Sequence, residues 1–78
     1  MTGEQYQAWR AKAGAGEEIR EWINGIQYAF VSLPDGWIAI FELDAGEFVP
    51  LIQAANMAHA RSYCILREPL PVSVTIIE

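Results

Sequence analysis

The middle of the chain has a pattern of apolar residues that is typical of β-strands. Residues 26–33 (IQYAFVSL) and 37–43 (WIAIFEL) are rich in β-branched and aromatic side chains. Between them, residues 34–36 (PDG) suit a three-residue loop, because proline presets the first turn residue and glycine accepts a left-handed conformation. The pattern therefore predicts an antiparallel hairpin in which Leu33 lies opposite Trp37.

This register gives the hairpin two largely apolar faces. One face combines Gln27, Ala29, Val31, Leu33, Trp37, Ala39, Phe41 and Leu43. The opposite face is apolar in its middle and polar at its ends, with Tyr28, Phe30, Ser32, Ile38, Ile40 and Glu42. An antiparallel sheet with one solvated face alternates more strictly than this. We therefore expect other elements or a partner to cover both faces.

The N-terminal segment predicts a short amphipathic helix. Thr2 and Gln5 have the spacing of a capping box, and apolar residues then recur at helical spacing. Gly14 and Gly16 can end the segment. The predicted helix covers residues 3–13.

The next segment, residues 17–25 (EEIREWING), allows two interpretations. Ile19, Trp22 and Ile23 lie at helical spacing, which favours a helix that ends at the glycine. An Asn-Gly pair between two apolar runs is also a strong signal for a two-residue hairpin turn. We adopt the hairpin, which makes residues 18–23 a strand, and keep the helix as the alternative.

The second half of the chain predicts another helix. We expect it over residues 47–61, with Pro50 in the first turn, where proline is tolerated. Its alanines would let it approach a sheet closely. We therefore expect this helix to pack on the face that carries Ala29, Val31 and Phe41.

Two further apolar runs predict strands. Residues 63–66 are short and apolar, and residues 72–77 are strongly β-branched. The expected fold is α+β: one compact domain over residues 1–78, with an antiparallel sheet of three to five strands and two helices.

Composition limits which covalent or metal cross-links can stabilise this domain and in which compartment we expect it. The single cysteine, Cys64, excludes an intrachain disulfide, and one histidine with one cysteine cannot supply the four ligands of a structural zinc site. No apolar run approaches the length of a membrane span, and the N-terminus lacks the pattern of a signal peptide. We expect a cytoplasmic protein, in the host cytoplasm if a phage encodes it, without metal or cofactor.

The charge pattern disfavours direct binding of nucleic acid. The net charge is −5, and the five basic residues are scattered along the sequence, whereas phosphate binding needs clustered bases. Glu42, Asp44 and Glu47 are the closest group of acids. They lack the spacing of a calcium loop. Solvated edges and helix starts are the simplest explanation for them, and an acidic surface that meets a basic partner is the alternative.

His59 and Cys64 are the one pair that could suggest nucleophilic catalysis. Five residues apart on a helix, they would point about 140° away from each other. A thiol between Tyr63 and Ile65 is expected to be buried. The chain also lacks nucleophile, phosphate-binding and redox motifs. We therefore expect no catalytic residues, and a small-ligand binder or enzyme that uses this pair is an alternative.

The leading hypothesis is a non-enzymatic protein-binding module. Small acidic proteins without motifs are common products of phages and mobile elements, among them inhibitors of bacterial defence complexes such as anti-CRISPR proteins. Such a protein would block a basic surface of its partner sterically. A homo-oligomeric structural protein of the virion-assembly type, with homodimers as one form, is an alternative. The predicted partner-binding residues are Tyr28, Phe30, Ile38, Ile40, Glu42, Asp44 and Glu47.

Overall fold

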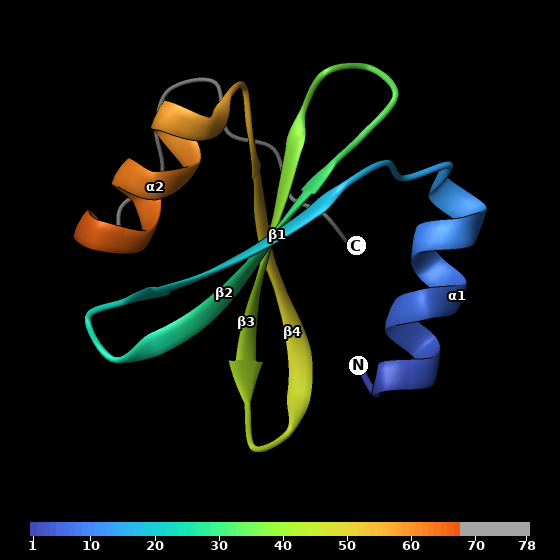
Figure 1. Ribbon diagram of the computed structural model, residues 1–78, viewed down its shortest axis with the longest axis horizontal. Coiled ribbons are helices and arrows are strands. Elements are labelled where there is room, and N and C mark those ends of the chain that lie inside the picture. Colours follow the sequence, from blue (N-terminus) through green and yellow to red (C-terminus); the bar gives the residue numbers. More distant parts are fainter. Residues whose placement is uncertain (68–78) are drawn as a thin grey trace.

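The computed structural model describes residues 1–67 as an antiparallel sheet with one helix on each face (Figure 1). The elements are α1 (Gly3–Ala13), β1 (Glu18–Ile23), β2 (Ile26–Ser32), β3 (Ile38–Asp44), β4 (Glu47–Ala54) and α2 (Met57–Leu66). The four strands follow one another in the order β1-β2-β3-β4. The predicted α+β class with an antiparallel sheet is thus confirmed. Within residues 1–67, no helix has the length and apolar character needed to cross a membrane.

The first helix has the predicted bounds. The Thr2 side chain accepts a hydrogen bond from the Gln5 amide, and the Gln5 side chain accepts one from the Thr2 amide. These two bonds complete the capping box and satisfy amides that a helix start leaves free. Gly14 ends the helix in the left-handed conformation, with a φ of 65°.

The β1–β2 hairpin confirms the strand interpretation of residues 18–23. Asn24 and Gly25 have φ values of 52° and 79°, as a type I′ turn requires. The β2–β3 register is also the predicted one, with Val31 opposite Ala39 and Phe30 opposite Ile40. Local turn chemistry therefore decided both hairpins.

The helix predicted for residues 47–61 is wrong in its first half, which forms β4. Ala45 and Gly46 make another two-residue turn, with φ values of 51° and 80°. Alanine rarely adopts such a φ, so the sequence does not signal this turn. Pro50 is accommodated because β4 is an outer strand and its register shifts opposite Ile40 and Phe41.

The second helix instead covers Met57–Leu66, so the strand predicted for residues 63–66 is also wrong. Asn56 caps the start of α2 by accepting a hydrogen bond from the His59 amide at 2.9 Å. Arg67 ends it in the left-handed conformation. The strand predicted for residues 72–77 lies outside the described residues.

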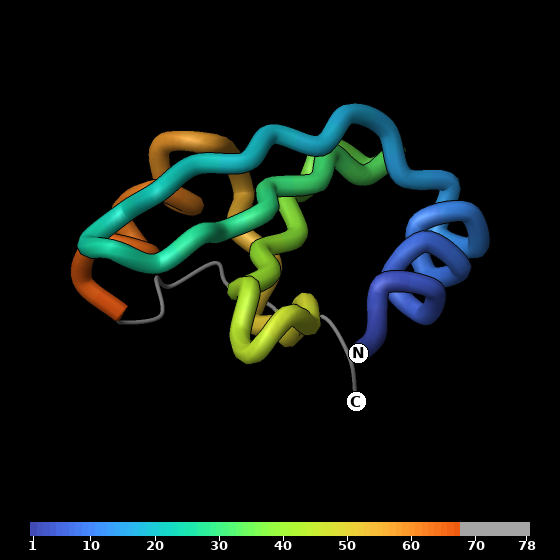
Figure 2. Tube along the Cα trace, turned by 60° about the horizontal axis from the view of Figure 1, so that its bottom comes forward, coloured from blue at the N-terminus to red at the C-terminus, as the bar shows by residue number. Residues whose placement is uncertain are grey.

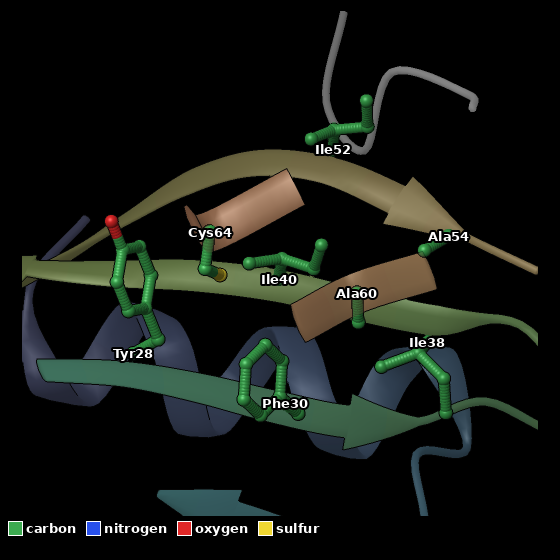
Figure 3. Close-up of a cluster of buried hydrophobic side chains, with 8 residues drawn as sticks. All are labelled: Tyr28, Phe30, Ile38, Ile40, Ile52, Ala54, Ala60 and Cys64. Carbon is green, nitrogen blue, oxygen red and sulfur yellow. The ribbon is translucent and has the colours of Figure 1, made fainter. Parts of the chain in front are cut away.

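The two helices cover the two apolar faces of the sheet. The core on the α1 side consists of Tyr6, Ala29, Val31, Ala39, Phe41 and Phe48. The core on the α2 side consists of Tyr28, Phe30, Ile38, Ile40, Ile52, Ala54, Ala60 and Cys64 (Figure 3). The prediction that the second helix packs on the Ala29/Val31/Phe41 face is therefore wrong. The first helix occupies that face, and its Tyr6 ring is buried against Phe41 and Phe48.

Candidate functional site

The apolar half of the predicted partner-binding set lies in the core on the α2 side. Tyr28, Phe30, Ile38 and Ile40 are all buried beneath α2, and none is more than 7% exposed (Figure 3). The face that the sequence left without a cover is therefore covered by the chain itself. These four side chains are not accessible to a partner in this structure.

Glu42, the first of the three predicted acids, contributes to the docking of α2. Arg67 donates one hydrogen bond to the Glu42 carboxylate at 2.9 Å and one to the Tyr28 hydroxyl at 3.1 Å. Burial acts against the charged guanidinium, but these two bonds outweigh it and raise the pKa of Arg67. Glu42 thus joins β3 to the end of α2.

Asp44 and Glu47, the other two acids, lie at the exposed tip of the β3–β4 hairpin. They are cross-strand partners on either side of the Ala45-Gly46 turn. Neither takes part in a salt bridge with the described residues. Like charges directly opposite each other destabilise a strand pair, and a positive φ at alanine adds strain. The tip therefore combines two locally unfavourable features.

The arginine side chains, by contrast, form ion pairs within the fold. Glu18 on β1 accepts hydrogen bonds from the Tyr6 hydroxyl and from Arg20, each at 2.5 Å, and Arg10 lies 3.7 Å away. Although burial opposes it, this set of partners lowers the pKa of Glu18. Glu18 thereby links β1 to α1.

A second ion pair links β1 to α2. Arg61 donates to both carboxylate oxygens of Glu21, at 3.1 and 2.7 Å. The hydrogen bonds from Arg61 lower the pKa of Glu21. A bidentate arginine–carboxylate pair fixes orientation as well as charge.

These pairs leave an acidic surface. Each arginine among the described residues is bound to a glutamate. Within residues 1–67, the charged side chains that form no salt bridge with another described residue are those of Glu4, Glu17, Asp35, Asp44 and Glu47, together with one base, Lys12. Most of these unpaired charges are therefore negative, and two of them, Asp44 and Glu47, lie at the β3–β4 tip.

His59 and Cys64 both lie on α2 and do not form a nucleophilic pair. Cys64 is 1% exposed, and burial raises the pKa of its thiol to about 12, so the thiol is protonated at neutral pH. The buried His59 Nδ1 has no hydrogen-bond partner among the described residues. The arrangement does not favour thiolate chemistry.

Other features of the described residues do not form a ligand site around this pair. A shallow depression of about 390 Å³ lies between the end of α1 and the β2–β3 loop, away from α2. It is lined by Trp9, Ala13, Leu33, Pro34, Asp35 and Gln53. Within residues 1–67, no group of three or more histidine, cysteine or acidic side chains is placed to hold a metal ion.

The exposed apolar residues of β1 were not among the predicted partner-binding residues. Trp22 is 70% exposed and Ile19 is 40% exposed, whereas most large apolar side chains of the sheet are buried. Exposed tryptophan is enriched at sites of protein binding. The hairpin interpretation of residues 18–23 placed these two side chains on the first strand of the chain. A first strand often lies at the edge of a sheet, and this was the one sequence feature that indicated their exposure.

Comparison with known proteins adds no family assignment. No protein-family model, curated protein or solved structure matches this chain significantly.

Proposed function

We propose that this chain is a non-enzymatic protein-binding module whose β3–β4 tip contacts a basic surface of another protein. The observation that carries the proposal is the cross-strand pair of Asp44 and Glu47, exposed, without a basic partner in the described residues, and closed by a strained turn at Ala45. Strained local conformations are concentrated at functional sites, where the rest of the fold supports them.

The distribution of charge supports the same proposal. The arginines are held in internal pairs, so a positively charged partner meets carboxylates with little competition from exposed bases. Complementary charge accelerates encounter and sets orientation more than it adds affinity. A basic surface that binds nucleic acid fits this description of the partner.

In its specific form, the proposal is a small inhibitor encoded by a phage or mobile element. The module would occupy the nucleic-acid-binding surface of a bacterial defence complex, as anti-CRISPR proteins do, and exclude the nucleic acid sterically. Small size and negative charge support this form. The proposed contact surface contains only Asp44 and Glu47 of the seven partner-binding residues predicted from the sequence. The others are excluded because Tyr28, Phe30, Ile38 and Ile40 are buried and Glu42 is paired with Arg67.

A comparative pull-down tests the proposal. The tip variant is Asp44→Asn/Glu47→Gln, and the control is Glu17→Gln/Asp35→Asn at the opposite end of the sheet. Each double change raises the net charge from −5 to −3, since −5 + 2 = −3. Asparagine at position 35 can still accept the hydrogen bond that Asp35 accepts from the Trp37 amide. The baits are exposed to lysate from cells that hold the native target, and bound proteins are identified by mass spectrometry.

We expect a basic protein that binds the wild type and the control but is depleted at least about tenfold on the tip variant, which corresponds to about 1.4 kcal/mol of binding free energy. The purified partner should then release a fluorescent nucleic acid when the wild type is added. If every captured protein binds the tip variant as well as the control, the tip is not the binding site. If the partner binds but keeps its nucleic acid, the blocking mechanism is wrong.

A further inference from the structure

Among residues 1–67, strand β1 forms an outer edge of the sheet that contains neither a proline nor a register shift. The other outer strand, β4, contains Pro50 and a register shift, and both features hinder the addition of another strand. β1 contains no proline, and its pairing with β2 is regular from Glu18 to Ile23. Figure 2 shows β1 running along the outside of the sheet.

The backbone of β1 presents hydrogen-bonding groups on its outer side. The Ser32 amide donates to the Glu17 carbonyl at 2.9 Å, so the backbone groups of Glu17 point toward β2. Successive residues of an antiparallel strand point these groups in alternate directions. The amides and carbonyls of Glu18, Arg20 and Trp22 therefore point away from β2.

The exposed apolar side chains of β1 lie beside this row of groups. Trp22 is on the α1 side of the sheet, opposite Gln27, and Ile19 is on the α2 side, opposite Phe30. A partner strand that adds to the edge would contact both side chains. Main-chain bonds would supply affinity in such a complex, and the alternating side chains would supply specificity.

We propose that β1 pairs antiparallel with β1 of a second copy of the chain, with Glu21 on the two-fold axis, and joins the two four-stranded sheets into one. The proposed dimer is independent of the proposed function, because it uses the β1 edge and leaves the β3–β4 tip free.

Side-chain chemistry selects a second copy in this register. Ile19 lies opposite Ile23 of the second copy, which matches two apolar side chains. Arg20 lies opposite Trp22 of the second copy, where the indole ring can pack against the apolar stem of the arginine while its guanidinium stays over the Phe48 ring of its own chain. Both matches occur twice, because the two-fold axis repeats them. This self-complementarity is the reason to choose a second copy over an unrelated strand.

The charges at the axis are compensated within each chain. Glu21 faces Glu21 of the second copy, but each carboxylate is held by its own Arg61 through two hydrogen bonds. A register displaced by two residues in one direction would place Arg20 against Arg20, a like-charge contact, and Ile19 against Glu21. Displacement in the other direction would place Trp22 against Trp22 but Glu21 against Ile23. Each displaced register therefore contains unfavourable apolar–charged contacts that the proposed register avoids.

Sedimentation velocity measures the predicted association. A contact of one short strand per chain is small, so we expect a dissociation constant of about 10–1,000 µM. Trp22→Lys, an exposed change that adds a charge to the edge, should weaken association at least about tenfold. Ile65→Lys is the matched control, since Ile65 is 57% exposed and lies on α2. Circular dichroism verifies that both variants are folded.

Disulfide trapping tests the register. A cysteine introduced by Glu21→Cys meets its own copy across the axis and should cross-link at least about tenfold faster than one introduced by Glu17→Cys, which lies outside the paired segment. Faster cross-linking through Arg20→Cys would overturn the register. A wild-type chain that stays monomeric to about 1 mM, or a dimer that Ile65→Lys weakens and Trp22→Lys does not, would overturn the dimer. A pull-down with wild type and Trp22→Lys as baits covers the remaining case. If the wild type is monomeric and captures another protein that Trp22→Lys does not capture, the edge binds that protein and the dimer proposal is wrong.

Discussion

The hydrogen bond between Tyr6 and Glu18 should be a main determinant of how α1 is held on the sheet. Tyr6 is fully buried, with its ring 4.5 Å from the Phe48 ring and 4.8 Å from the Phe41 ring, measured between centroids. Its hydroxyl donates to the Glu18 carboxylate at 2.5 Å. Tyr6→Phe removes this bond and keeps the ring contacts. The change therefore separates the polar contribution from the packing contribution.

The expected loss follows from the surroundings of the carboxylate. A hydrogen bond to a charged group contributes about 1.5–3 kcal/mol to stability. Glu18 retains Arg20 and its side chain is 14% exposed, so water and the guanidinium compensate in part. We expect Tyr6→Phe to lower the free energy of unfolding by about 1–2 kcal/mol. A domain of this size has a total of roughly 4–12 kcal/mol, so the loss is measurable.

Urea denaturation followed by tryptophan fluorescence and circular dichroism measures this loss. Each kcal/mol should also lower Tm by about 4–8 °C. Tyr63→Phe is the matched control, because the Tyr63 hydroxyl forms no side-chain hydrogen bond with the described residues. We expect the control to change stability by less than about 0.5 kcal/mol.

The pH dependence gives a second readout that a packing defect would not produce. The folded-state pKa of Glu18 lies below its usual value of 4.5, because the hydrogen bonds from Tyr6 and Arg20 outweigh burial. This contribution is present above pH 4.5 and is lost as the pH falls through the folded-state pKa. The difference between wild type and Tyr6→Phe should therefore be constant well above pH 4.5 and shrink as the pH falls below it. An equal difference at all pH values, or a loss no larger than that of Tyr63→Phe, would refute the reasoning.

Three further predictions concern the β3–β4 turn, the Cys64 thiol and α2. Ala45→Asn should raise the free energy of unfolding by about 1 kcal/mol, because asparagine tolerates a positive φ, and an unchanged or lower urea midpoint would contradict this. Wild-type stability should fall above about pH 9, because the thiol pKa is raised to about 12 by burial and the unfolded chain releases that proton first. Cys64→Ala should show a shallower fall between pH 9 and pH 10 in urea titrations, and equal slopes would exclude this cause. Ala60→Leu should lower stability by about 1–3 kcal/mol, because Ala60 is fully buried between α2 and the sheet, and a loss below about 0.5 kcal/mol in thermal denaturation would show that the interface has room.

The candidate sites were partly predictable from residue type. The carboxylates of Asp44 and Glu47 could be proposed as a surface group because they are close in sequence and charged. Their isolation from basic partners could not be predicted, because it depends on which arginines meet Glu18, Glu21 and Glu42 across the fold. The exposure of Trp22 likewise depends on where α1 lies on the sheet.

By itself, the sequence determined the elements that local chemistry specifies. The capping box at Thr2 determined the first helix, and the Asn24-Gly25 and Pro34–Gly36 turns determined two hairpins and their register. In each case the deciding residues are neighbours in the chain. Their conformational preferences act before any distant contact forms.

Only the tertiary structure decided the second half of the chain and the covering of the two faces. Residues 47–54 became a strand because the free edge of β3 could pair with them, although Ala45 does not favour the turn and Pro50 does not favour a ladder. The two faces of the sheet are both apolar, so composition alone could not assign a helix to each. The assignment follows from chain connectivity and from the Tyr6–Glu18 and Arg67–Glu42 contacts, which join residues far apart in sequence.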